Sequence, residues 1–223
     1  GPIVRYRDVA AELDHRTNTV DEFAAGAQRF TVGLAKKVLL ADALAGLVTG
    51  IWGDLASLTV LSAWLGLIGY ALQLYFDFSG YSDMAIGLGR MLGFRFPENF
   101  RYPYLCSSIS DFWRRWHISL GSWFKEYLYF PLGGSRTGTL RTLRNLLLVW
   151  LATGLWHGAS WNYVLWGLYF GVLICLEKLL APRFRAHPRK GLLAGLYRPV
   201  CLLLAVLGFG IGWYVLLGNG LVP

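Results

Sequence analysis

The sequence predicts an all-α polytopic membrane protein that combines spanning, re-entrant and interfacial helices. Hydrophobic residues make up 55% of the chain and charged residues only 15%, whereas an ordinary soluble domain carries roughly 25% charged residues. Several apolar stretches also approach the ~20 residues that a helix needs to cross a bilayer. We therefore predict that residues 1–223 form a single membrane domain and that the chain is a piece of a longer protein.

The charge balance and the cysteines narrow the class of partner. The net charge of +8 comes from 21 basic and 13 acidic residues, an excess that in a membrane protein usually reflects cytoplasmic loops. No basic cluster alternates with aromatic residues, so nucleic acid is not expected as a partner. Membrane lipids are the expected partners, because the composition is that of a membrane protein. The cysteines, Cys106, Cys175 and Cys201, lack metal-ligand spacing, and we expect neither a metal site nor a disulfide framework.

The first 52 residues predict a polar surface segment followed by a helix. Thr19 and Glu22 have the spacing of a capping box, which marks a helix start. Residues 30–52 are apolar but contain Lys36 and Lys37, charges that a lipid-exposed span tolerates poorly at its centre. We expect a tilted or partly interfacial helix whose lysines reach toward head groups. Gly53-Asp54 should end it.

Residues 57–76 form the first clear spanning helix, because they supply 20 residues without a charge. A polar, glycine-containing stretch over residues 76–83 follows, with Asp77 near its start. Residues 84–94 would then rise only about 16 Å as a helix. That is too short to cross, so we predict a re-entrant or horizontal element there.

Residues 96–104 read as an interfacial loop, and Ser110 can cap a helix over residues 111–120. One face of that helix carries its aromatic side chains, namely Trp113, Trp116 and His117. Arg114 and Arg115 point away from this face, so the helix is expected to lie flat at the membrane surface. From this pattern alone, the imidazole fits an interfacial side chain as well as a catalytic one.

His157 interrupts an apolar run over residues 145–180. The basic loops that flank this run, residues 136–144 and 182–198, should both face the cytoplasm by the positive-inside rule. The run would then enter the membrane and return, with His157 at depth. Its two arms would rise about 18 Å and about 30 Å, which predicts a tilted arm or a thinned bilayer. Residues 201–217 form a last apolar helix.

A polar side chain at membrane depth usually marks a functional site. His157, next to Trp156, could act as a general base on a hydroxyl group that attacks an activated carbonyl. A second polar group must orient it or stabilise the developing negative charge, and the candidates are His117, Asn99 and Asp77. The structural alternative is a histidine satisfied by one backbone carbonyl. No Gly-x-Ser-x-Gly elbow is present, which favours direct transfer between two bound substrates.

Ordered motifs in the chain resemble the membrane-bound O-acyltransferase family, most closely its bacterial alginate O-acetyltransferase branch. The motifs are Tyr75–Gly87, Pro97–Phe100, Asp111–Leu120, Tyr129–Gly134 and Leu155–Ala159. The resemblance implies that the chain is the central portion of a multi-pass acyltransferase domain of the inner (plasma) membrane, without the helices at both ends. It places the family's two motif histidines on His157 and His117.

The same resemblance implies the reaction: an acyl group passes from a cytoplasmic thioester such as acetyl-CoA to a hydroxyl group. The acceptor would be an extracytoplasmic polysaccharide or an acetyltransferase partner protein, and no tightly bound cofactor is implied. The residues expected to bind substrate or support the histidines are Asp77, Asn99, Trp113, Trp116, Trp156, Arg114 and Arg115. The alternative is a transporter or channel in which His157 relays protons. Such proteins usually contain internal repeats, and this sequence has none.

Overall fold

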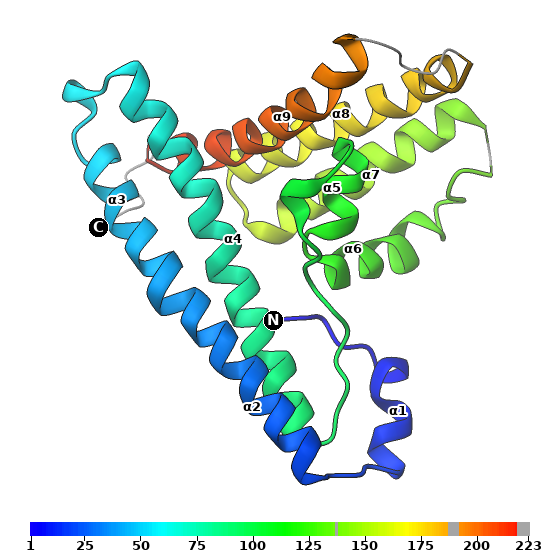
Figure 1. The fold of residues 1–223 in the computed structure, drawn as a ribbon. Coiled ribbons are helices and arrows are strands. Elements are labelled where there is room, and N and C mark those ends of the chain that lie inside the picture. The colour runs from blue at the N-terminus through cyan, green and yellow to red at the C-terminus, as the bar shows by residue number, and fades with distance from the viewer. Residues whose placement is uncertain (137, 187–191, 218–223) are drawn as a thin grey trace. The chain divides into compact units, whose positions relative to one another are not determined.

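The computed structural model describes residues 1–136, 138–186 and 192–217. Within these ranges every regular element is helical (Figure 1), which confirms the predicted all-α class. The chain divides into two compact units. The first comprises Gly1–Arg101 and Trp116–Leu120, and the second comprises Tyr102–Arg115 and Gly121–Pro223. The single domain over residues 1–223 stays a prediction.

The first unit is built around a long helical hairpin. Its elements are α1 (Tyr6–Asp14), α2 (Val20–Ala35), the π-helical turn η1 (Lys36–Ala41), α3 (Asp42–Trp52), the 3-10 turn η2 (Leu55–Ser57) and α4 (Val60–Met91). The Thr19 side chain caps α2 by accepting from the Glu22 N–H at 3.1 Å, which confirms the predicted start. The segments α2, η1 and α3 follow one another as a continuous helical path that packs along α4 (Figure 1). This path ends at Gly53, as predicted.

Glycines let α2 and α4 approach until their backbones touch. A Cβ atom added at Gly87 would lie 2.6 Å from the carbonyl oxygen of Gly26 and from the backbone nitrogen of Phe30. One added at Gly80 would lie 2.7 Å from the carbonyl oxygen of Gly33. Gly80, which lies in the polar stretch that predicted an interruption, therefore belongs to the contact between two helices.

Helix α4 is continuous, so the predicted interruption at residues 76–83 and the separate re-entrant element at 84–94 are wrong. Its 32 residues rise about 48 Å. The polar residues do not break it because their partners lie on η1: the ammonium group of Lys37 pairs with Asp77, and that of Lys36 lies 2.6 Å from Asp83. The prediction that these lysines reach toward head groups is wrong for the same reason.

The second unit contains the 3-10 turn η3 (Pro103–Leu105), α5 (Ile109–Arg115), the π-helical turn η4 (Lys125–Tyr129), α7 (Thr139–His157), α8 (Trp161–Ala186) and α9 (Leu192–Leu217). Helix α6 (Ile118–Phe124) begins in the first unit and continues into the second. Helix α7 packs against α8, and α5 packs against α8 and α9. Rings from these helices form one aromatic core, consisting of Phe112, Trp113, Trp150, Trp166, Phe170 and Phe209.

The single surface helix predicted over residues 111–120 is wrong. Helix α5 ends at Arg115, and α6 starts only at Ile118. The break coincides with His117, whose φ of 45° lies in the left-handed region. The helix start is also earlier than predicted, because Ser108 and not Ser110 accepts from the Asp111 N–H, at 3.0 Å.

The break at His157 is confirmed, since α7 ends there and α8 begins at Trp161. The arm before it is longer than predicted: α7 starts at Thr139, and its 19 residues rise about 28 Å. Much of the predicted 136–144 loop is therefore helical, and the short arm of about 18 Å that favoured a thinned bilayer is not observed.

The predicted loop over residues 182–198 is also partly helical, because α8 extends to Ala186 and α9 starts at Leu192. Residues 187–191 lie outside the described residues. Among the described helices, two are long and apolar enough to cross a membrane: Val60–Met91 and Trp161–Leu180.

Candidate functional site

The first unit buries a polar cluster around His117. The side chain of Asn99 is completely buried, and those of His117 and Ser119 are nearly so. The side-chain oxygen of Asn99 lies 3.0 Å from His117 Nδ1 and 2.8 Å from the hydroxyl oxygen of Ser119. The structure thus brings together two residues that the sequence had proposed separately, His117 and Asn99.

The backbone around His117 is held by the same asparagine. The Ile118 N–H donates to the main-chain oxygen of Asn99 at 3.0 Å, and the Ser119 N–H donates to its side-chain oxygen at 3.2 Å. A left-handed backbone at a residue other than glycine costs on the order of 1–3 kcal/mol and persists where the surroundings enforce it. Asn99 holds this backbone conformation with its main-chain oxygen and its side-chain oxygen.

Aromatic rings enclose the imidazole and the adjacent indole. Phe78 of α4 contacts the His117 ring edge-on with centroids 4.7 Å apart. Phe100 contacts Trp116 at 5.1 Å in the same way, and Tyr75 lies 6.3 Å from that indole. The His117 ring is therefore fixed by packing as well as by hydrogen bonds.

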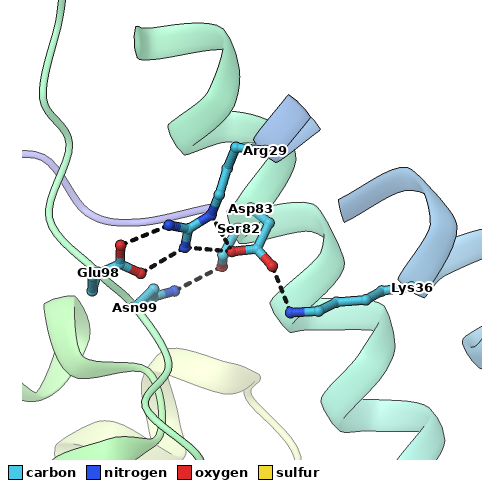
Figure 2. Close-up of polar contacts among 6 residues, drawn as sticks. All are labelled: Arg29, Lys36, Ser82, Asp83, Glu98 and Asn99. Atoms are coloured by element: carbon cyan, nitrogen blue, oxygen red, sulfur yellow. Dashed lines mark hydrogen bonds and ion pairs between the residues drawn. The ribbon is translucent and has the colours of Figure 1, made fainter. Parts of the chain in front are cut away.

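Charged side chains lie next to this cluster (Figure 2). The Asn99 amide nitrogen donates to Ser82 Oγ at 3.0 Å, and the next residue on α4 is Asp83. One Asp83 oxygen accepts from Arg29 at 2.6 Å, and the other accepts from Lys36 at 2.6 Å. The asparagine that contacts the histidine is thus tied to an ion-paired segment of α4.

Arg29 also joins this segment of α4 to the loop that carries Asn99. Its guanidinium nitrogens lie 2.6 Å and 2.8 Å from the two carboxylate oxygens of Glu98, the residue before Asn99 (Figure 2). Sequence reasoning missed this network and the role of Ser119. A carboxylate inside an apolar helix, Asp83, was the one local signal for it.

Replacing Asp83 with alanine should destabilise the protein by about 2–4 kcal/mol. Its side chain is only 11% exposed, and its removal leaves Arg29 and Lys36 without a carboxylate that they share. Thermal unfolding of the full-length protein in detergent measures the effect. The matched control is Asp42→Ala, because Asp42 is 55% exposed and lies 3.4 Å from Lys37, so its loss should cost less than about 1 kcal/mol. Equal effects would contradict the structural role of Asp83.

Four other residues that were predicted to bind substrate or to support the histidines lie outside the polar cluster around His117. Asp77 pairs with Lys37, as described above. Trp113 packs in the aromatic core of the second unit, with its centroid 4.7 Å from those of Trp150 and Phe170. Arg115 donates to Asp111 at 3.0 Å, and Arg114 is exposed. Roles of these residues in substrate binding stay predictions.

His157 occupies the end of α7 in the second unit. Its Nδ1 lies 2.7 Å from the carbonyl oxygen of Thr153, one helical turn earlier. The ring contacts Trp156 and Trp166, each with a centroid distance of 4.9 Å. Trp166 is buried, while His157 and Trp156 are exposed in the described residues. The imidazole thus rests on a buried indole with part of its surface accessible.

A close contact between α7 and α8 fixes the position of this helix end. A Cβ atom at Gly154 would lie 2.3 Å from the carbonyl oxygen of Tyr163, and one at Gly167 would lie 2.4 Å from that of Trp150. The turn that carries Thr153 and His157 is therefore pressed against α8. Any larger side chain at Gly154 would move the histidine.

The sequence matches proteins of known family. The model of the membrane-bound O-acyltransferase family matches residues 1–210. The chain is 48% identical over 215 residues to a probable alginate O-acetylase, AlgI, of Azotobacter vinelandii, which covers 96% of this chain and 41% of that protein. It is 43% identical over 181 residues to a peptidoglycan O-acetyltransferase of Helicobacter pylori, covering 80% of the chain and 34% of the relative.

A more distant relative is a teichoic acid D-alanyltransferase of Bacillus subtilis, 31% identical over 189 residues, which covers 78% of this chain and 47% of that protein. The chain therefore spans less than half the length of each of these relatives. The family match covers both units and includes both motif histidines. With its apolar helices and these matches, the chain is part of a membrane protein and belongs to the membrane-bound O-acyltransferase family.

Proposed function

We propose that the protein containing this chain is a membrane O-acetyltransferase that modifies an extracytoplasmic polysaccharide. The observation that carries the proposal is the 48% identity to a probable alginate O-acetylase over 96% of the chain. The donor would be a cytoplasmic acyl thioester such as acetyl-CoA. The protein would cross the inner (plasma) membrane several times and work with an acceptor polysaccharide or an extracytoplasmic acetyltransferase partner.

In the proposed reaction the oxygen of an acceptor hydroxyl attacks the carbonyl carbon of the thioester. A new carbon–oxygen bond forms, and the carbon–sulfur bond breaks. The hydroxyl proton passes to a general base on the protein and then to the departing thiolate, so that an ester and a free thiol are the products. Such positioned proton transfer typically contributes about 10²–10⁴-fold to the rate.

His157 has the protonation pattern that a general base needs. The Thr153 carbonyl oxygen can only accept, so the proton of the neutral ring resides on Nδ1. Nε2 then carries the lone pair and can accept the hydroxyl proton. A purely structural histidine would make the same carbonyl contact. The exposure of the ring supports the catalytic role, because a base must reach its substrate.

Isotope-labelled acetyl-CoA tests the proposal directly. Membrane vesicles that contain the full-length protein should transfer the label to a polysaccharide hydroxyl, and mass analysis of the cell-surface polymers should show acetyl esters only in cells that make the protein. If the polymers carry the same acetyl esters without the protein, the proposed function is wrong. Transport of protons without any acetyl transfer would support the channel or transporter alternative.

His117→Ala should lower acetyl transfer by roughly 100-fold, the smaller end of the range for acid–base catalysis. The reason is that His117 is buried beside an oriented amide and not at a lipid-facing surface. Label transfer by the variant, normalised to the amount of folded protein, measures the effect. Wild-type activity in this variant would mean that His117 has only a structural role.

A further inference from the structure

We propose that Asn99 is a positioning residue that holds His117 in the tautomer with its proton on Nδ1, so that the neutral ring accepts protons at Nε2. The proposal rests on the proposed function in assigning a catalytic use to His117. The tautomer itself follows from hydrogen-bond directions within the first unit. Neither the family match nor the relatives assign this role to Asn99.

The first step is the orientation of the Asn99 amide. The Ser119 backbone N–H can only donate, and it points to the side-chain atom of Asn99 at 3.2 Å. That atom must therefore be the oxygen. The amide nitrogen then faces Ser82 Oγ at 3.0 Å, where it finds an acceptor (Figure 2). Both ends of the amide are satisfied in this orientation only.

The second step concerns the serine hydroxyl. The backbone N–H of Ile3 points to Ser119 Oγ at 2.9 Å and is again an obligate donor. The hydroxyl accepts there, and its own proton is directed to the Asn99 oxygen at 2.8 Å. The segment before α1 thus helps to orient the cluster. Two donors from Ser119 converge on the one amide oxygen.

The third step gives the tautomer. The same oxygen lies 3.0 Å from His117 Nδ1. A carbonyl oxygen has no proton to give, so Nδ1 must carry the proton of the bond. A lone pair on Nδ1 would face the oxygen and be repelled. Because one ring nitrogen sets the state of the other, Nε2 is the unprotonated nitrogen of the neutral ring.

This assignment separates two roles that the sequence left open. A neutral His117 with its proton on Nδ1 cannot donate a hydrogen bond from Nε2 to a developing oxyanion. It can only accept a proton there, so it acts as a base or as a relay that takes a proton. Asn99 thereby decides which of these chemistries His117 performs.

Asn99→Ala tests the role without removing the main-chain contact, since the Ile118 N–H still donates to the backbone oxygen of residue 99. In the full-length protein we expect kcat for acetyl transfer to fall at least roughly tenfold, because loss of the correct tautomer costs far more in other enzymes. KM for the thioester should change less than about twofold, because the defect is in the chemical step. A rise in KM with unchanged kcat would overturn the proposal.

Asn99→Asp keeps an oxygen acceptor for Nδ1 but adds a negative charge. A carboxylate beside the imidazole stabilises its protonated form, and the protonated ring cannot accept a proton. The acid limb of the rate–pH profile should therefore move to higher pH by about one unit or more, with activity recovering as the pH rises. An unchanged profile would contradict a direct action of Asn99 on His117.

Asn145→Ala is the matched control. Asn145 is also fully buried, but its amide donates to the carbonyl oxygens of Leu132 and Gly134 in the second unit. This change should reduce the amount of folded protein and leave the pH profile of the remaining protein unshifted. A shift like that of Asn99→Asp would show that the pH effect is not specific to Asn99.

Two further measurements separate this proposal from the proposed function. In a His117→Ala background, Asn99→Ala should cause no additional loss of kcat, and an additive loss would overturn action through His117. Nitrogen-15 NMR of the labelled full-length protein, with the signal assigned by its absence in His117→Gln, reads the tautomer directly. A proton on Nε2 would overturn the assignment, whether or not the protein transfers acetyl groups.

Discussion

Replacing His157 with alanine is expected to reduce acetyl transfer by roughly 10²–10⁴-fold, the contribution of a positioned general base. The protein should still accumulate in the membrane, because the ring lies at an exposed helix end and its hydrogen bond among the described residues is to the Thr153 carbonyl oxygen. Transfer of labelled acetyl groups to the polymer, per amount of folded protein, measures the change.

His157→Gln distinguishes chemistry from packing at this position. A glutamine amide can donate to the Thr153 carbonyl oxygen and rest on Trp166, but it cannot accept a proton at neutral pH. It should therefore be as inactive as the alanine variant. His15→Ala is the control, since His15 is exposed just after α1, and it should transfer at the wild-type rate. Recovery of activity in the glutamine variant would mean that His157 is structural.

Gly87→Ala is expected to destabilise the protein by about 1–3 kcal/mol or more, although alanine is the better helix former. The added Cβ atom would meet the Gly26 oxygen and the Phe30 nitrogen at 2.6 Å. Both are backbone atoms, so relief requires α2 and α4 to move apart. The thermal unfolding midpoint and the yield of monodisperse protein in detergent report the effect.

Gly46→Ala is expected to change the stability of the protein in the opposite direction. Gly46 lies inside α3, and a Cβ atom there would meet nothing within 4 Å. The change should stabilise the protein by roughly 0.5–1 kcal/mol through helix propensity alone. If both variants shift the midpoint in the same direction, the close contact between α2 and α4 does not hold in solution.

Local patterns predicted the break at His157 because the signal there is local. A polar ring followed by Gly158 ends a hydrophobic run, and the helix stops at that point. The break predicted near Asp77 failed because the partners of the carboxylates are remote in sequence. Lys37 lies 40 residues from Asp77, and Lys36 lies 47 residues from Asp83. A helical period cannot reveal such pairs, so polar residues inside α4 looked like an interruption.

At His117 the sequence predicted a continuous helix where the structure has a break, again because the deciding contact is remote in sequence. The spacing of Trp113, Trp116 and His117 fits a single helical face, and nothing local opposes a helix there. The break is imposed by Asn99, which binds the backbone of Ile118 and Ser119 from 19 and 20 residues away in the chain. The family resemblance identified the histidine, but the asparagine contact required the fold.

The π-helical turn η1 has a consequence for chain length. An α-helix advances about 100° per residue, and a π-helical turn absorbs one extra residue without breaking the rod. Deleting a single residue from Lys36–Ala41 would return this turn to ordinary α-helical winding and leave α3 at nearly its present rotation relative to α2, because the wide turn is what absorbs the extra residue. The glycine contacts of α2 and the buried side of α3 would then still face α4 together. Functional homologues should therefore tolerate the loss of one residue in this turn, whereas a one-residue deletion inside α2 or α3 would rotate the helix beyond it by about 100°.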